Sequence, residues 1–250
     1  MAANELKAQL DDAVRAAAVA AADVAASTPD SLPPIRIASL GGGPGNDALG
    51  CLLFATLCGT SASKATVAGA AKNTHLPSYH RRLKLTVYDF CHGWEDIVKQ
   101  VAAALPAVMS SIIDEHPSES VQSLPLPPPL HSLEFAVCDL QLPPSSPTNA
   151  EVMRSASEVD LTVCSFCCHE SGAATKRPLS ENLLRRLLQE MKYGAALLVI
   201  DLWEKSISEV ENLIGETGKV SGQQSNGSFV VMRLGSSRDF PFKGLFAVKQ

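Results

Sequence analysis

The feature that most constrains the fold is a glycine-rich turn between a strand-like and a helix-like segment. Residues 41–45, Gly-Gly-Gly-Pro-Gly, follow the apolar residues 35–40 and precede residues 47–58, whose apolar positions recur with helical spacing. Glycines at such a place let the backbone turn tightly and let a ligand approach it without a Cβ in the way. The next helix begins with free N–H groups and the positive end of its dipole. The segment therefore predicts a strand–turn–helix unit with a ligand-binding bend.

Strand-like and helix-like segments alternate along most of the chain. We expect strands at residues 35–40, 83–89, 133–139, 159–166, 195–201, 229–234 and 245–248, and helices at residues 3–26, 47–58, 94–113, 178–192 and 207–214. Alternation implies parallel strands with helices on both faces, and two final strands without a helix between them must pair antiparallel. The predicted fold class is α/β: a Rossmann-like, seven-stranded, mostly parallel sheet with helices on both faces and an antiparallel C-terminal strand.

The length favours one main domain. The chain has 250 residues, of which 46% are hydrophobic, enough for a single core. We assign that core to residues 31–250, with proline-rich insertions near 116–130 and 141–149, because proline opposes regular structure. Residues 1–30 read as a separate alanine-rich helix that serves as a lid, binds a protein partner or forms a tail.

Composition narrows the classes of function. No apolar run approaches the ~18 residues of a membrane span, and acidic residues near the N-terminus argue against a secretory signal. The seven cysteines are an odd number and lie mostly in apolar segments, which indicates reduced thiols in an intracellular protein. We expect it in the cytoplasm or in the nucleus and nucleolus. The net charge of −5 lacks the basic excess of a free-standing nucleic-acid binder.

Three kinds of ligand compete for the glycine turn. A P-loop requires Gly-Lys-Ser/Thr, whereas Gly45 is followed by Asn46 and Asp47. A dinucleotide fingerprint can be fitted to residues 43–48, but Asp47 would crowd a pyrophosphate with negative charge. A ligand without phosphate tolerates this acid, which suits an ammonium or a sulfonium group.

Two acids follow the next two predicted strands. Asp89 ends the strand at residues 83–89, where a carboxylate can accept hydrogen bonds from both hydroxyls of a ribose. Asp139 ends the following strand, where it can bond an adenine amino group with Leu140 as an apolar neighbour of the ring. Together with the turn, they predict a nucleoside site; singly, each acid is equally well a solvated strand end.

These segments resemble those of the class I S-adenosylmethionine-dependent methyltransferases over roughly residues 33–250. The similar segments are the glycine turn, Tyr88-Asp89, Cys138-Asp139-Leu140 and the strands at 163–166, 195–203 and 229–248. The resemblance implies S-adenosylmethionine as cofactor and a final strand inserted antiparallel between its neighbours. The chain is also similar to a eukaryotic branch near the fungal large-subunit ribosomal RNA uridine methyltransferases, which would imply methylation of rRNA.

The resemblance also implies that Gly41, Gly43 and Gly45 line the methionine part of the cofactor, that Asp89 binds the ribose, and that Asp139 and Leu140 flank the adenine. Further candidates for the cofactor site are Asp47, Phe90 and Ser165. One departure concerns Ser39, which stands where the family commonly has an acid that binds the amino group of the cofactor. Asp47 is the candidate to replace it.

The segment after the fourth strand is where the methyl acceptor docks in such enzymes. His169 or Glu170 can act there as a general base, or the two form only a polar helix start. The Asn/Asp-Pro-Pro-aromatic motif of amino-group methylation is absent. A cysteine nucleophile at Cys167 or Cys168, as in carbon methylation of pyrimidines, is an alternative.

The cysteines of this segment also raise the question of a metal. Cys164, Cys167, Cys168 and His169 lie close in sequence, but the paired Cys-x-x-Cys knuckles of a structural zinc site are absent, so we expect none. Basic residues at 80–84, 176–177 and 185–186 are expected on an ordinary solvated surface, although Lys176 and Arg177 would suit an anionic substrate or an RNA backbone.

The sequence leaves three functions open. The first is methyl transfer to RNA or to a small molecule. The second is a nicotinamide-dependent oxidoreductase on a dinucleotide fold, which requires a last strand parallel to the others. The third is a non-catalytic interaction module that keeps the fold.

Overall fold

The computed structural model describes residues 33–45, 47, 50–51, 82–115, 130–171, 181–217, 228–234 and 243–250. The predictions for the alanine-rich helix, for most of the helix at 47–58 and for the first proline-rich insertion lie outside these residues. Of the predicted helix at 47–58, Asp47, Gly50 and Cys51 are described and are helical.

Seven strands form one sheet in the order β3-β2-β1-β4-β5-β7-β6. The strands are β1 (Ile35–Leu40), β2 (Leu83–Asp89), β3 (Leu130–Val137), β4 (Leu161–Ser165), β5 (Ala196–Asp201), β6 (Phe229–Leu234) and β7 (Lys243–Lys249). Neighbouring strands from β3 to β5 pair in parallel, whereas β7 pairs antiparallel with both β5 and β6. The predicted fold class is confirmed, including the insertion of the last strand between its neighbours.

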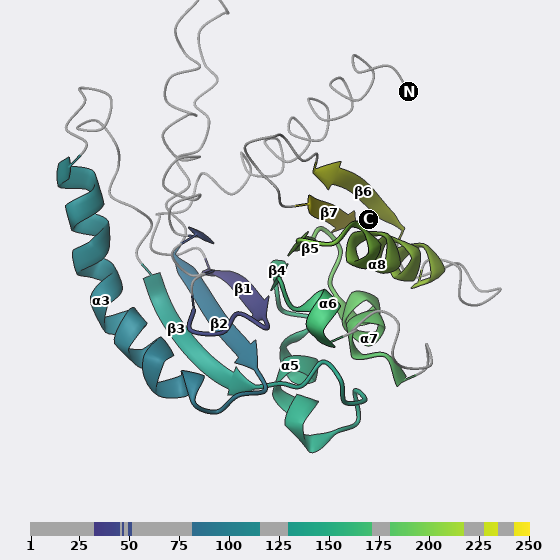
Figure 1. Ribbon diagram of the computed structural model, residues 1–250, viewed down its shortest axis with the longest axis horizontal. Coiled ribbons are helices and arrows are strands. Elements are labelled where there is room, and N and C mark those ends of the chain that lie inside the picture. The colour runs from purple at the N-terminus through teal and green to yellow at the C-terminus, as the bar shows by residue number, and fades with distance from the viewer. Residues whose placement is uncertain are drawn as a thin grey trace, which may run out of the picture.

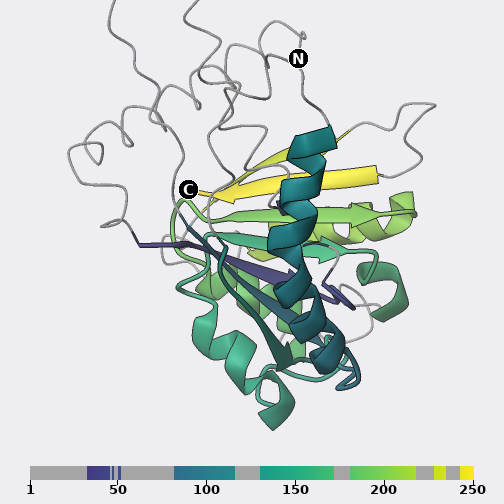
Figure 2. The same cartoon turned by 90° about the vertical axis from the view of Figure 1, so that its left-hand side faces the viewer.

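Helices cover both faces of the sheet (Figure 1). Helix α3 (Trp94–Glu115) crosses one face, as Figure 2 shows, and α5 (Ala150–Ser155), α7 (Leu183–Glu190) and α8 (Glu204–Thr217) lie against the other. Short α6 (Cys168–Ser171) follows β4. None of the described helices has the length and hydropathy needed to cross a lipid bilayer.

Alternating side chains divide the core into two clusters. In β1, Ile37 packs with Val98 and Leu105 of α3, whereas its neighbour Ala38 faces the cluster that contains the apolar side of α7. That side is a helical stripe of buried leucines, which are Leu183, Leu184, Leu187 and Leu188. Burial on both faces explains why the parallel strands read as nearly continuous apolar runs.

The predicted elements differ from the structure in one missed helix and in several boundaries, including the start of α8 at Glu204 rather than at 207. The sequence suggested no helix between the third and fourth strands, yet the 3-10 turn Pro147–Asn149 leads into α5. Pro147 occupies the first position of that turn, where its missing N–H costs nothing and its fixed φ is favourable. In addition, β3 begins at Leu130 rather than 133 and ends at Val137, so Asp139 lies in the loop after the strand.

Because β7 lies inside the sheet, its apolar side chains are part of the core. Leu245 is fully buried, whereas Val230 of the neighbouring β6 is 52% exposed. Leu245→Ala should lower the free energy of unfolding by about 2–5 kcal/mol through lost contacts and a cavity. Val230→Ala, the matched control, should change it by less than about 0.5 kcal/mol. Urea denaturation measures both; similar losses would contradict the interior position of β7.

Candidate functional site

The glycine turn sits at the carboxyl edge of the sheet, between β1 and β2. The amide of Gly41 donates to the carbonyl of Tyr88 at 2.7 Å, and Gly45 closes the turn on the carbonyl of Gly42 at 3.0 Å. A Cβ built on Gly41 would lie 2.3 Å from the Cβ of Cys167, and its φ of +64° suits glycine. The turn is therefore packed directly against the loop that follows β4.

The carboxylate of Asp89 lies against the turn, as the sequence predicted. Its Oδ2 accepts a hydrogen bond from the amide of Gly43 at 3.2 Å, and its Oδ1 accepts one from the amide of Cys91 at 2.9 Å. The residue is 6% exposed. Each carboxylate oxygen has a second lone pair, so the group retains acceptor capacity for hydroxyls that reach it.

A serine and an acid form a second polar pair beneath the turn. The hydroxyl of buried Ser39 donates to Oδ2 of Asp47 at 2.6 Å. A Cβ on Gly42 would lie 2.1 Å from that hydroxyl oxygen, so only glycine fits there. Ser39 thus places a carboxylate close to the position where the resembling family commonly carries its own acid.

The loop after β3 is organised by Asn149, which the sequence analysis missed. Its fully buried side chain accepts from the amide of Asp139 and donates to the carbonyls of Asp139, Leu142 and Pro143, at 2.9 to 3.2 Å. Oδ1 of Asp139 accepts from the amide of Gln141 at 2.7 Å. The amide side chain of Asn149 therefore holds the backbone of the loop that carries the candidate adenine-side residues.

Asp201 at the end of β5 is the second residue that the sequence analysis missed. Its fully buried carboxylate lies 3.1 Å from Nδ1 of His169 and accepts from the amide of Trp203 at 3.1 Å and from that of His169 at 3.3 Å. The rings of His169 and Trp203 lie 6.4 Å apart. An acid at the end of a strand was the signal that selected Asp89 and Asp139, and it could have selected Asp201 as well.

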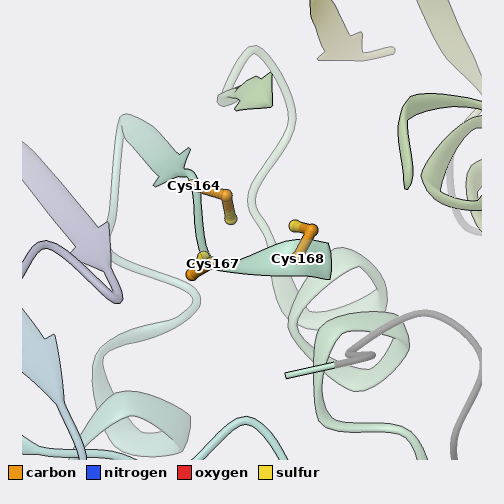
Figure 3. A group of neighbouring side chains, drawn as sticks. All are labelled: Cys164, Cys167 and Cys168. Carbon is orange, nitrogen blue, oxygen red and sulfur yellow. The ribbon is translucent and has the colours of Figure 1, made fainter. Parts of the chain in front are cut away.

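Three cysteines gather next to this pair. The sulfurs of Cys164, Cys167 and Cys168 lie within 4.8 Å of one another, and all three residues are buried (Figure 3). Hydrogen bonds from Cys164 and then from Cys167 hold the pKa of the Cys168 thiol well below its usual range. In the sequence between Cys164 and Cys167, the backbone of Phe166 has a φ of +58°. This angle lies in the left-handed region, which a residue with a Cβ rarely adopts.

Exposed apolar side chains line the same edge of the sheet. Phe90 follows β2 and is 72% exposed, and Trp203 follows β5 and is 60% exposed. Phe166, after β4, is also exposed. We call these three residues the aromatic rim. Large exposed apolar groups at one edge are typical of a surface that binds a partner or a ligand.

The structure brings several of the predicted site residues together. Gly43 and Asp89 are hydrogen-bonded, Gly41 abuts the loop of His169 through Cys167, and Ser165 ends β4. The side chain of Glu170 lies outside the described part of the chain. The expectation of a solvated basic surface at 185–186 is wrong for Arg185, which is buried in α7, and holds for exposed Arg186.

A cavity of about 230 Å³ lies elsewhere, against the face of β1, β2 and β3 next to α5. Its lining includes Arg36, Lys84 and Glu134. Since ligands of open α/β sheets bind at the carboxyl ends of strands, we place the candidate site at the glycine turn and not in this cavity.

Comparisons with known proteins find similarity only at the level of solved structures. No family model matches the chain, and no curated protein matches it. The similar structures include a precorrin-6y C5,15-methyltransferase from Geobacter metallireducens, with 7% identity over 91% of this chain and 88% of that one and a TM-score of 0.41. A putative methyltransferase from Streptococcus mutans in complex with SAH has 10% identity, coverage of 89% and 93%, and a TM-score of 0.42.

An O-methyltransferase family protein from Burkholderia thailandensis has 11% identity, coverage of 96% and 58%, and a TM-score of 0.45. Such low values say nothing about activity, and none of these structures supports the finer resemblance to fungal rRNA uridine methyltransferases.

The assignment of the fold rests on the order and the directions of the strands in this protein's own sheet. The fold is the Rossmann-like methyltransferase fold. The antiparallel β7 contradicts the nicotinamide oxidoreductase alternative, which requires a last strand parallel to the others.

The role of Asn149 can be tested by measuring how its substitution changes the stability of the protein. Asn149→Ala leaves three carbonyls and one amide without their hydrogen-bond partner and should lower the free energy of unfolding by about 1–3 kcal/mol. Asn149→Asp keeps the acceptor but sets a carboxylate beside three carbonyl oxygens, so it should cost at least as much. Thermal or urea unfolding measures both variants, and an Asn149→Asp protein as stable as wild type would disprove this hydrogen-bond network.

Proposed function

We propose that this protein is an S-adenosylmethionine-dependent methyltransferase whose nucleoside site lies beside the glycine turn and the Asp89 carboxylate that the turn contacts. The observation that carries the proposal is the direct contact between the Gly43 amide and the Asp89 carboxylate on the methyltransferase sheet. This contact sets a glycine-rich bend beside an acid suited to ribose hydroxyls.

The charges around the turn suit this cofactor. S-adenosylmethionine carries a sulfonium and an ammonium and has no phosphate, so an acid at the start of the following helix attracts rather than repels it. Asp47, oriented by the hydroxyl of Ser39, is the group that would receive the ammonium. Asp139 and Leu140 lie in the loop that would flank the adenine.

His169 and Asp201 form the candidate acid–base pair. When bound, the cofactor supplies an activated methyl group, whose transfer depends mainly on alignment with the acceptor. An acceptor N–H or O–H must lose a proton as its bond to carbon forms. His169 would take that proton at Nε2, because the Asp201 carboxylate accepts a hydrogen bond from Nδ1–H and so selects this tautomer.

The aromatic rim supports a flat acceptor. Phe90, Phe166 and Trp203 are exposed aromatic residues, and a base or another planar molecule can stack on such side chains. The acceptor we propose is therefore a planar group, either a base of RNA or an aromatic small molecule. A screen for transfer of labelled methyl groups to fractionated RNA, protein and metabolites identifies it.

One observation favours a second function. Asp89 is nearly buried and already accepts two backbone hydrogen bonds, which is also what a purely structural acid would do. An interaction module that retains the fold without the cofactor would show this arrangement. Such a module binds neither S-adenosylhomocysteine nor NAD.

Calorimetric titration with S-adenosylhomocysteine tests the proposal. Wild type should bind it and should not bind NAD. Asp89→Ala should weaken binding by about 1–3 kcal/mol, because the ribose hydroxyls lose their acceptor. Asp96→Ala, an exposed acid of α3, is the control and should bind as wild type does. Equal affinity in the folded Asp89→Ala protein would refute the ribose assignment, and a melting curve of each variant establishes that it is folded.

The acid–base pair predicts a specific kinetic pattern. With the acceptor identified by the screen, His169→Ala should lower kcat by about 100-fold, the usual contribution of a general base. Asp201→Asn should also lower kcat, since His169 loses the carboxylate that orients its ring. Both variants should bind S-adenosylhomocysteine normally. A loss confined to KM or to cofactor affinity would assign the pair a structural role instead.

A further inference from the structure

We propose that Cys164, Cys167 and Cys168 form a binding site for one thiophilic metal ion, for which Zn²⁺ is the probe. The three sulfurs come from the end of β4, the following loop and the first residue of α6, and they turn toward a common space (Figure 3). Their separations are within 4.8 Å. This inference is independent of the methyl-transfer proposal.

The spacing is close to that of a metal thiolate centre. With zinc–sulfur bonds of about 2.3 Å, tetrahedral geometry sets two sulfurs about 3.8 Å apart. Sulfurs within 4.8 Å therefore need to move inward only slightly. Thiolates select soft or borderline ions such as zinc over magnesium or calcium, which prefer oxygen ligands.

The backbone between the cysteines provides independent support. Phe166 is the one described residue other than glycine with a positive φ, at 58°. Such a conformation costs of the order of 1–3 kcal/mol and persists where the surroundings require it. Here it reverses the chain after Ser165, and this reversal brings Cys167 and Cys168 back toward Cys164.

Metal binding would change the bonding of the cluster in a defined way. Three metal–sulfur bonds would form and three thiol protons would leave to solvent, so an ion of charge +2 would leave the centre with a net charge of −1. The thiol of Cys167, which now donates to the carbonyl of Leu40 at 3.1 Å, would lose its proton, and with it that hydrogen bond, on binding the ion. His169 lies outside the group of ligand atoms within 4.8 Å, so a water molecule would complete the coordination.

The ion would tie together the elements that frame the candidate site. It would fasten α6 to the end of β4, and through the contact of Cys167 with Gly41 it would brace the glycine turn. The three cysteines are buried, so in this proposal the ion holds these elements together from the interior of the protein.

Metal analysis of the full chain tests the site. Protein expressed with added zinc and purified without chelators should contain about one zinc ion per chain, held by thiolates. Replacement of that ion by Co²⁺ should give a sulfur-to-cobalt charge-transfer band in the near ultraviolet. Wild type without stoichiometric metal, or a cobalt complex without this band, would overturn the proposal.

Matched variants locate the ligands. Cys167→Ser and Cys168→Ser should lose the metal and the cobalt band. Cys138→Ser, which changes a buried cysteine directly after β3, should keep both. Should the ligand variants fail to fold, wild type alone decides: a strong chelator should remove the metal and lower the melting temperature, and added zinc should restore it. Metal retained by folded Cys167→Ser, or a melting temperature that chelation leaves unchanged, would count against the site.

Discussion

The candidate site depends on one carboxylate that joins two strands. Asp89 ends β2 and accepts two hydrogen bonds from backbone amides. One comes from Gly43 in the turn after β1, and the other from Cys91 in the loop after β2. Since a buried carboxylate needs such partners, the acid and the turn fix each other's position. The same contact explains how one group can serve both structure and ligand: two lone pairs hold the backbone, and two remain for hydroxyls.

The sheet was predictable because its signals are local. Apolar runs such as residues 83–89 match the observed strand, and the helix-free connection between the last two strands led to the antiparallel pairing of β7. The short α5 was missed because the prolines and serines before it dominate that stretch of sequence, while its contribution to the core, buried Val152, is small. Proline there starts a helix instead of preventing one.

The site was predictable only where its residues follow strands. Gly43 and Asp89 were found because strand ends gather at one edge. Asn149 was not, since an asparagine in a loop looks the same whether it is solvated or satisfies four backbone groups. The thiol cluster was judged by sequence spacing alone, which cannot show that the backbone reverses at Phe166.

The place of β7 also constrains the order in which the sheet can assemble. Although β6 precedes β7 in the chain, β6 pairs only with β7 among the described strands, and β7 alone joins it to β5. During synthesis, β1 to β5 can associate while the edge of β5 is still open, and β6 must wait for its successor. That open edge is a template for pairing with other chains. Newly made molecules should therefore be most prone to aggregation just before β7 leaves the ribosome.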